Sequence, residues 1–168
     1  KAESPGPSVS KLVPKVQSTA KILYTIYIIL TIVEIIFLLI GKMPLFDTLC
    51  LSFGTAGTGG FGIKNDSIAS YSTYNQVVIT VFMILFGINF NAYYLLLTKK
   101  VMQAAKNEEV RYYLGIIGLA IVAIAINTRE MFTSFGRAFQ QAAFQVGSII
   151  TTTGYATTDF NVWPVFSK

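Results

Sequence analysis

The sequence predicts an all-α membrane protein in which one helical unit occurs twice, and three observations lead to this fold class. Hydrophobic residues make up 53% of the 168 residues and charged residues only 12%, whereas soluble domains carry about 25%. Apolar runs of helical length recur along the chain. A short apolar run followed by a stretch rich in threonine and glycine also occurs twice, with the two copies 94 residues apart.

Composition also excludes several classes of protein. The net charge is +5, but the basic residues flank apolar runs and form no patch among aromatic residues, so we expect no nucleic-acid partner. The chain has no histidine and a single cysteine, Cys50, which excludes disulfides and Cys/His metal sites within one chain. We assign no catalytic residues and do not expect an enzyme. The polar, Pro/Ser-rich start at Lys1 has no signal-peptide core and is typical of the inner part of a longer chain.

The first apolar run covers residues 22–40 and follows a polar segment over residues 1–21. Its 19 residues would rise about 28 Å as a helix, which is close to the hydrocarbon thickness of a bilayer. Only Glu34 interrupts the run, and the sequence from Gly41 to Pro44 ends it. We therefore predict a membrane-spanning helix.

The next apolar run, residues 45–53, has nine residues and is too short to span, which is typical of a re-entrant segment. Residues 54–62 follow with five glycines, which permit left-handed backbone and close approach to a ligand. Irregular backbone at membrane depth is tolerated where protein buries it or where it lines a watery cavity. An ordinary glycine-rich turn is the alternative. Residues 63–75 are polar and expected in water, and residues 76–97 are predicted to return as a spanning helix.

The second unit repeats this order without a returning helix. Residues 99–111 are a charged connector, and residues 112–126 form an apolar run that we extend to 110–128 as a spanning helix. A polar turn over residues 127–137 precedes a short apolar run and a Thr-rich loop; Trp163 and Pro164 then suit a membrane interface. The predicted domains are thus residues 1–21 and 99–111 as cytoplasmic segments, 22–98 as one complete repeat, and 112–168 as a second, incomplete repeat.

Positive charge fixes the orientation. One cluster precedes the first helix and one lies in the connector, and both must lie on the same side because two helices separate them. Cytoplasmic loops carry an excess of Lys and Arg, so both clusters are predicted in the cytoplasm and the short segments enter from outside. The clusters are Lys1, Lys11, Lys15 and Lys21, and Lys99, Lys100, Lys106 and Arg111.

The two loops share one pattern, Thr-x-Gly-aromatic-small, when Gly60 is aligned with Gly154. The potassium-channel filter Thr-Val-Gly-Tyr-Gly has the same pattern, and its carbonyl oxygens replace the hydration shell of the ion. We therefore expect helix–pore loop–helix units with re-entrant pore helices and extended filter loops. The aromatic side chains Phe61 and Tyr155 are expected to pack behind the filter. A Thr-rich strand or turn is the alternative for the second loop. The predicted K⁺-binding backbone is that of Thr58, Gly59, Gly60, Phe61, Thr152, Thr153, Gly154 and Tyr155.

Three polar residues interrupt the predicted membrane helices. For Glu34 we favour a structural role as a hydrogen-bond acceptor behind a pore loop, with an ion relay as the alternative. For Asn89 and Asn91 we favour hydrogen bonds between helices, with the lining of a water-filled inner cavity as the alternative.

Three stretches, residues 59–62, 87–97 and 144–160, resemble the Trk/Ktr/HKT superfamily of potassium transporters, especially its bacterial TrkH- and KtrB-type membrane subunits. The resemblance implies four such repeats around one pore with pseudo-fourfold symmetry, of which this chain holds the second and part of the third. It further implies a homodimer, a cytoplasmic nucleotide-binding regulatory subunit, contact with membrane lipid, and a multi-pass protein of the bacterial inner membrane. K⁺ would be the transported ion, with no covalently bound cofactor.

The predicted function is potassium transport through a channel-like pore with a filter of backbone carbonyls. Three alternatives stay open: an unrelated pore-loop cation channel in which short chains form oligomers, a sodium-permeable member of the same superfamily, and a membrane scaffold or enzyme subunit whose glycine-rich loops only pack helices.

Overall fold

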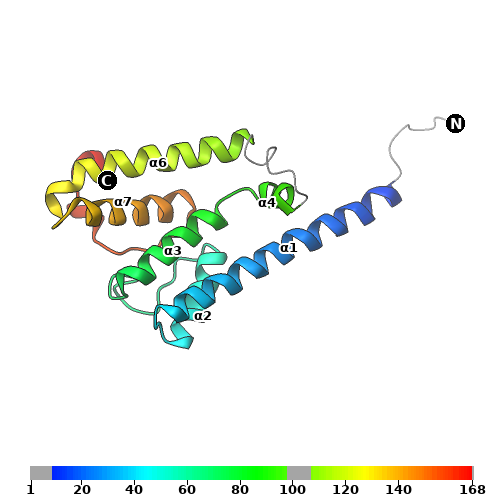
Figure 1. Ribbon diagram of the computed structural model, residues 1–168, viewed down its shortest axis with the longest axis horizontal. Coiled ribbons are helices and arrows are strands. Elements are labelled where there is room, and N and C mark those ends of the chain that lie inside the picture. Colours follow the sequence, from blue (N-terminus) through cyan, green and yellow to red (C-terminus); the bar gives the residue numbers. More distant parts are fainter. Residues whose placement is uncertain (1–8, 98–106, 168) are drawn as a thin grey trace.

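The protein is described by a computed structural model, which covers residues 9–97 and 107–167. Within these residues every regular element is a helix, so the all-α prediction is confirmed. Figure 1 shows α1 extending from one side of the molecule, with α6 and α7 lying side by side on the other. The α-helices are α1 (Val9–Ile40), α2 (Leu45–Ala56), α3 (Thr73–Phe86), α4 (Phe90–Leu97), α6 (Glu108–Thr128) and α7 (Phe135–Ile150), and the 3₁₀ turns are η1 (Arg129–Met131), η2 (Phe160–Val162) and η3 (Val165–Ser167).

Two helices contain segments long and apolar enough to cross a membrane, Ala20–Ile40 within α1 and Glu108–Met131, which covers α6 and η1. Fewer than a quarter of the residues in either segment are buried inside the molecule, as expected for helices that face lipid. Helix α1 begins at Val9, earlier than the predicted start at residue 22. Hydropathy marks only the apolar part of a helix, and the Lys-, Gln- and Ala-containing part before it also suits helical backbone.

The prediction of one returning helix over residues 76–97 is wrong, because the chain forms α3 and α4 with a break between Phe86 and Phe90. A Cβ atom built on Gly87 would lie 2.2 Å from the Tyr113 hydroxyl and 2.8 Å from Cγ2 of Thr151. A residue with a side chain therefore does not fit here between α6 and the second loop. Glycine is also a poor helix former, which favours the break at this position.

Helices α2 and α7 are the two short helices that precede the Thr/Gly loops. Their 12 and 16 residues correspond to about 18 and 24 Å, less than the thickness of a membrane core. Both are longer than predicted. Helix α2 continues through Ala56, and α7 begins at Phe135 inside the predicted polar turn, where the Ser134 side chain accepts a hydrogen bond from the Arg137 N–H and caps the helix.

Two hydrophobic clusters hold these helices together. The first joins α1, α2 and α3, and it also takes in Phe144 and Tyr155 from the second unit. The second lies between α6 and α7 and contains Ile117, Ile121 and Val146. Helix α7 packs against both α3 and α6, so it connects the two units.

The end of the described chain packs back onto α6. The Ser167 hydroxyl donates to the Asn127 side chain at 2.6 Å, and the Trp163 ring meets the Phe132 ring edge-on at 6.3 Å. Trp163 was predicted at a membrane interface, but its side chain is buried inside the protein.

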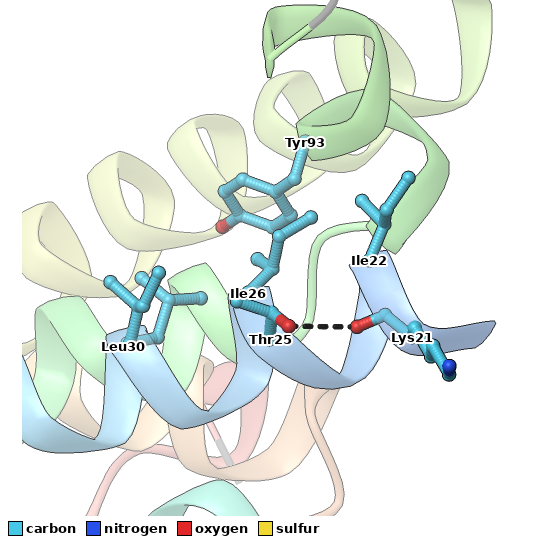
Figure 2. Close-up of a pocket in the computed structure, with 7 residues that line it drawn as sticks. Lys21, Ile22, Thr25, Ile26, Leu30 and Tyr93 are labelled. Atoms are coloured by element: carbon cyan, nitrogen blue, oxygen red, sulfur yellow. Dashed lines mark hydrogen bonds between the residues drawn. The ribbon is translucent and has the colours of Figure 1, made fainter. Parts of the chain in front are cut away.

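An apolar groove of about 490 Å³ lies between α1 and α4. Figure 2 shows Ile26 and Leu30 of α1 beside the Tyr93 ring, with Lys21 at one end. No residue of either Thr/Gly loop lines this groove, so it is separate from the candidate site.

Candidate functional site

Both loops leave their helices with the same backbone geometry. Gly57 ends α2 with φ −87° and ψ 3°, and Thr151 ends α7 with φ −89° and ψ 0°. The Gly57 N–H donates to the Phe53 carbonyl at 2.9 Å, and the Thr151 N–H donates to the Gly147 carbonyl at 3.2 Å. Gly57 and Thr151, and likewise Phe53 and Gly147, are separated by the same 94 positions that relate the sequence repeats.

The correspondence continues through the loops. Thr58 and Thr152 have φ angles of 49° and 59°, and Gly60 and Gly154 have φ angles of 67° and 87°. All four lie in the left-handed region, which favours glycine and is strained for a β-branched residue. The repeat read from the sequence is therefore also a repeat of backbone conformation.

Seven of the eight predicted ion-binding carbonyls accept no hydrogen bond from any residue that the structure describes. The exception is Tyr155, whose carbonyl accepts from the Ser148 hydroxyl at 2.6 Å. Most of the seven residues are exposed in this chain, so their carbonyls are open to water or to a ligand. The seven are those of Thr58, Gly59, Gly60, Phe61, Thr152, Thr153 and Gly154.

The two loops meet at Gly60. A Cβ atom built on this residue would lie 1.9 Å from the Thr153 carbonyl oxygen and 3.2 Å from the Gly154 carbonyl carbon. The two backbones are therefore in direct contact. A Cβ atom on Gly154 would meet nothing within 4 Å, so this glycine borders open space.

The electrostatics of the helix ends favour a cation. Helices α2 and α7 both direct their C-terminal ends toward the loops, and neither has a basic residue in its last turn. The C-terminal end of a helix carries a partial negative charge. Two such ends, together with the free carbonyls, place negative potential where the loops meet.

Tyr155 packs behind the second loop, as predicted. Its side chain is 1% exposed, and its hydroxyl donates to the Leu51 carbonyl of α2 at 3.2 Å. The hydroxyl lies so close to Gly54 that a Cβ atom there would be 2.2 Å from it. The aromatic residue of one unit thus packs against the short helix of the preceding unit.

Within this chain the same packing is not seen for Phe61, whose side chain is 87% exposed. The reason lies in the geometry just described. Tyr155 packs against α2, the short helix of the preceding unit. The described residues contain no equivalent short helix before the unit of Phe61.

Threonine hydroxyls form hydrogen bonds within the second loop and to the end of α7. The Thr151 hydroxyl donates to the Gly147 carbonyl at 2.6 Å and lies 2.8 Å from the Thr153 hydroxyl. The Thr152 hydroxyl donates to the carbonyl of Thr151 at 2.7 Å. These bonds hold the loop in register with the end of α7.

Glu34 is fully buried, but its predicted role as a hydrogen-bond acceptor is not seen. Neither carboxyl oxygen has a hydrogen-bond partner among the described residues. The nearby Thr55 hydroxyl donates instead to the Leu51 carbonyl at 2.8 Å, because this bond follows the axis of its own helix. Asn89 does bridge two helical segments, since its side chain donates to Glu109 at 2.5 Å. The Asn91 side chain and the connector residues 99–106 lie outside the described part of the chain.

The segments that follow the two loops are also paired, and sequence reasoning did not find this contact. The Ile68 N–H donates to the Ala156 carbonyl at 3.0 Å, and the Ala156 N–H donates to the Ser67 hydroxyl at 3.2 Å. Ser67 lies in the polar segment over residues 63–75, and nothing in that segment indicates its partner.

Comparison with known proteins tests the resemblance drawn from the sequence. A family model described as a TrkH cation transport protein matches residues 3–126. This chain belongs to the TrkH family. The predicted membership of the superfamily is therefore confirmed, and the chain is a membrane protein of a transporter family, not an enzyme.

Individual relatives agree with the family. The Trk system potassium uptake protein TrkH of Salmonella typhimurium is 30% identical over 171 residues, which cover 99% of this chain and 35% of that protein. The protein of the same name from Vibrio parahaemolyticus is 34% identical over 174 residues, covering 99% and 36%. The crystal structure of the potassium transporter TrkH from Vibrio parahaemolyticus matches with a TM-score of 0.84 at 31% identity, covering 92% of this chain and 34% of that one. The TrkH-family chain thus spans about a third of the length of these relatives.

Proposed function

We propose that this TrkH-family chain contributes part of a potassium-conducting pore, in which its two Thr/Gly loops supply backbone oxygens for the ion. One observation carries the proposal. Two loops repeat the same cap bonds and the same left-handed positions, and they leave seven carbonyls free directly after two helix C-termini.

The chemistry suits K⁺ better than a divalent ion. Rings of carbonyl oxygens replace the hydration shell of K⁺ in known filters, whereas Ca²⁺ and Mg²⁺ sites use carboxylates. Among the described residues no three His, Cys, Asp or Glu side chains group together. The loops therefore offer neutral oxygens and helix dipoles as ligands.

Two loops do not make a ring, because a potassium filter uses four. The relatives are about three times as long as this chain, and the superfamily resemblance implies four repeats in one polypeptide. We propose that the remaining loops come from further repeats of the same protein. Membrane orientation follows the positive clusters, with residues 1–21 and 99–111 in the cytoplasm.

The wider setting follows the family resemblance. We propose a multi-pass protein of the bacterial inner membrane that forms a homodimer and pairs with a cytoplasmic nucleotide-binding regulatory subunit. The names of the relatives, all of them potassium uptake proteins, support K⁺ over Na⁺ as the transported ion.

The test uses the full-length transporter that contains this segment, reconstituted in proteoliposomes. Gly154→Ser should lower the K⁺/Na⁺ permeability ratio because a side chain enters the filter backbone. Gly118→Ser is the matched control, since Gly118 also borders open space but lies in α6, away from the loops. Rubidium uptake with and without competing Na⁺ gives the ratio. An unchanged ratio in Gly154→Ser would show that this loop is not in the filter and would favour the scaffold alternative.

A further inference from the structure

A buried glutamine connects the two units outside the predicted filter. Gln76, in the first turns of α3, is 5% exposed. Its side-chain nitrogen lies within hydrogen-bonding distance of three carbonyls in the segment that returns from the first loop. These are the carbonyls of Ile68, Ala69 and Tyr71, at 3.3, 3.1 and 3.1 Å.

The oxygen of the same side chain faces the second unit. It accepts from the Gln140 side chain at 3.0 Å and from the Gln141 side chain at 3.5 Å, both on α7. The oxygen of Gln141 in turn accepts a hydrogen bond from the Thr157 hydroxyl, which lies two residues beyond Tyr155. The side-chain amides of Gln76 and Gln141 together therefore link the segment after the first loop to the segment after the second.

These contacts form a closed circuit. From Gln76 the circuit runs to Ile68, from Ile68 through its N–H to the Ala156 carbonyl, and from there along the chain to Thr157. It returns through Gln141 to Gln76. Residues 156 and 157 are joined by a peptide bond, and the other links between residues are hydrogen bonds. Three of these hydrogen bonds are buried: Gln76 to Ile68, Gln141 to Gln76, and Thr157 to Gln141.

A side-chain amide suits the centre of this circuit. It must donate to carbonyls on one side and accept from amides on the other, and a carboxylate or an apolar side chain cannot do both. A buried donor or acceptor without a partner costs free energy, so shifts that break these hydrogen bonds are disfavoured.

We propose that Gln76 and Gln141 are positioning residues that fix the outer end of the second filter loop against the first, and so set ion selectivity. The proposal rests on the proposed function. Neither side chain is placed on the ion. They act through Thr157 and Ala156, which follow the filter residues of the second loop directly.

The experiment uses the full-length transporter in proteoliposomes, with the K⁺/Na⁺ permeability ratio and the apparent melting temperature measured together. Thr157→Val removes the hydroxyl at nearly constant volume and should lower the ratio several-fold. Thr157→Ser, which keeps the hydroxyl, should restore it. Thr128→Val is the control, since the buried Thr128 hydroxyl donates only within α6, to Ile124 at 2.8 Å, and its ratio should stay at the wild-type value.

Gln141→Leu tests the same link from the other side. Gln141→Leu removes this bond and also the bond from Gln141 to Gln76, so the double variant with Thr157→Val should lower the ratio no further than Gln141→Leu alone. Multiplied effects in the double variant, or a normal ratio in Thr157→Val with a lowered melting temperature, would overturn the proposal and leave the circuit a stabilising role only. If Gly154→Ser also leaves the ratio unchanged, the proposed function itself fails; if Gly154→Ser lowers the ratio and Thr157→Val does not, only the positioning role fails.

Discussion

Replacing Gly60 and Gly154 by alanine separates two costs in stability, the strain of a left-handed backbone and the steric clash between the two loops. Both residues have a positive φ, and a Cβ atom in the left-handed region costs roughly 1–2 kcal/mol. Gly154 borders open space, so Gly154→Ala should lose only this amount of stability. At Gly60 the new Cβ atom would lie 1.9 Å from the Thr153 carbonyl oxygen, which is backbone and cannot rotate away.

Overpacking of this kind adds about 1–3 kcal/mol, so Gly60→Ala should cost roughly 2–5 kcal/mol in total. The measurement is the apparent melting temperature of the full-length transporter in detergent, with rubidium uptake beside it. Gly118→Ala is the control: it lies in α6 with open space around it and should leave stability equal or slightly higher. Equal losses in Gly60→Ala and Gly154→Ala would refute the contact between the two loops.

Three further predictions concern the membrane topology, the Phe61 side chain and the buried Tyr71. In a background without the native cysteine, Ser70→Cys should react with a membrane-impermeant thiol reagent added outside intact cells, and Lys15→Cys should not; the reverse pattern would invert the topology. Phe61→Cys in the full-length transporter should be protected from the same reagent relative to Ser70→Cys, because the repeat seats this aromatic on another unit's short helix; full labelling would break the analogy with the second loop. Burial, together with the hydrogen bond from the Tyr71 hydroxyl to Asp47 at 2.7 Å, raises the pKa of Tyr71 above its usual 10. Stability from this contact should be constant below about pH 10 and decline above it as the unfolded state ionises, and Tyr71→Phe should weaken that alkaline decline.

The sequence is informative where the chemistry is local. Apolar runs predict the helices around residues 22–40, 45–53, 112–126 and 138–150, since burial in lipid or in a core requires them. The aligned glycines predict the loops because few other residues accept the left-handed backbone found at Gly60 and Gly154.

The sequence is misleading where contacts between residues far apart in the chain determine the structure. The break at Gly87 lies inside a predicted spanning run, and the sequence does not show that Tyr113 and Thr151, far along the chain, leave no room for a side chain there. The bonds of Gln76 join three segments, α3, residues 68–71 and α7, and a glutamine at the start of an apolar run gives no hint of its partners. Phe61 and Tyr155 occupy equivalent positions yet differ in exposure, because only one of them has the preceding unit beside it.

The left-handed threonines are the strongest argument that the loops are selected for more than packing. Glycine would adopt the backbone of Thr58 and Thr152 without strain, whereas a β-branched residue there is a true outlier. Such positions cost of order 1–3 kcal/mol each and persist where the surrounding structure imposes them. Here the same cost occurs at the same point of both repeats, at the first of the free carbonyls in each loop. A loop that only packed helices would have no reason to retain it twice, whereas a loop that must hold a line of carbonyl oxygens in a fixed direction does.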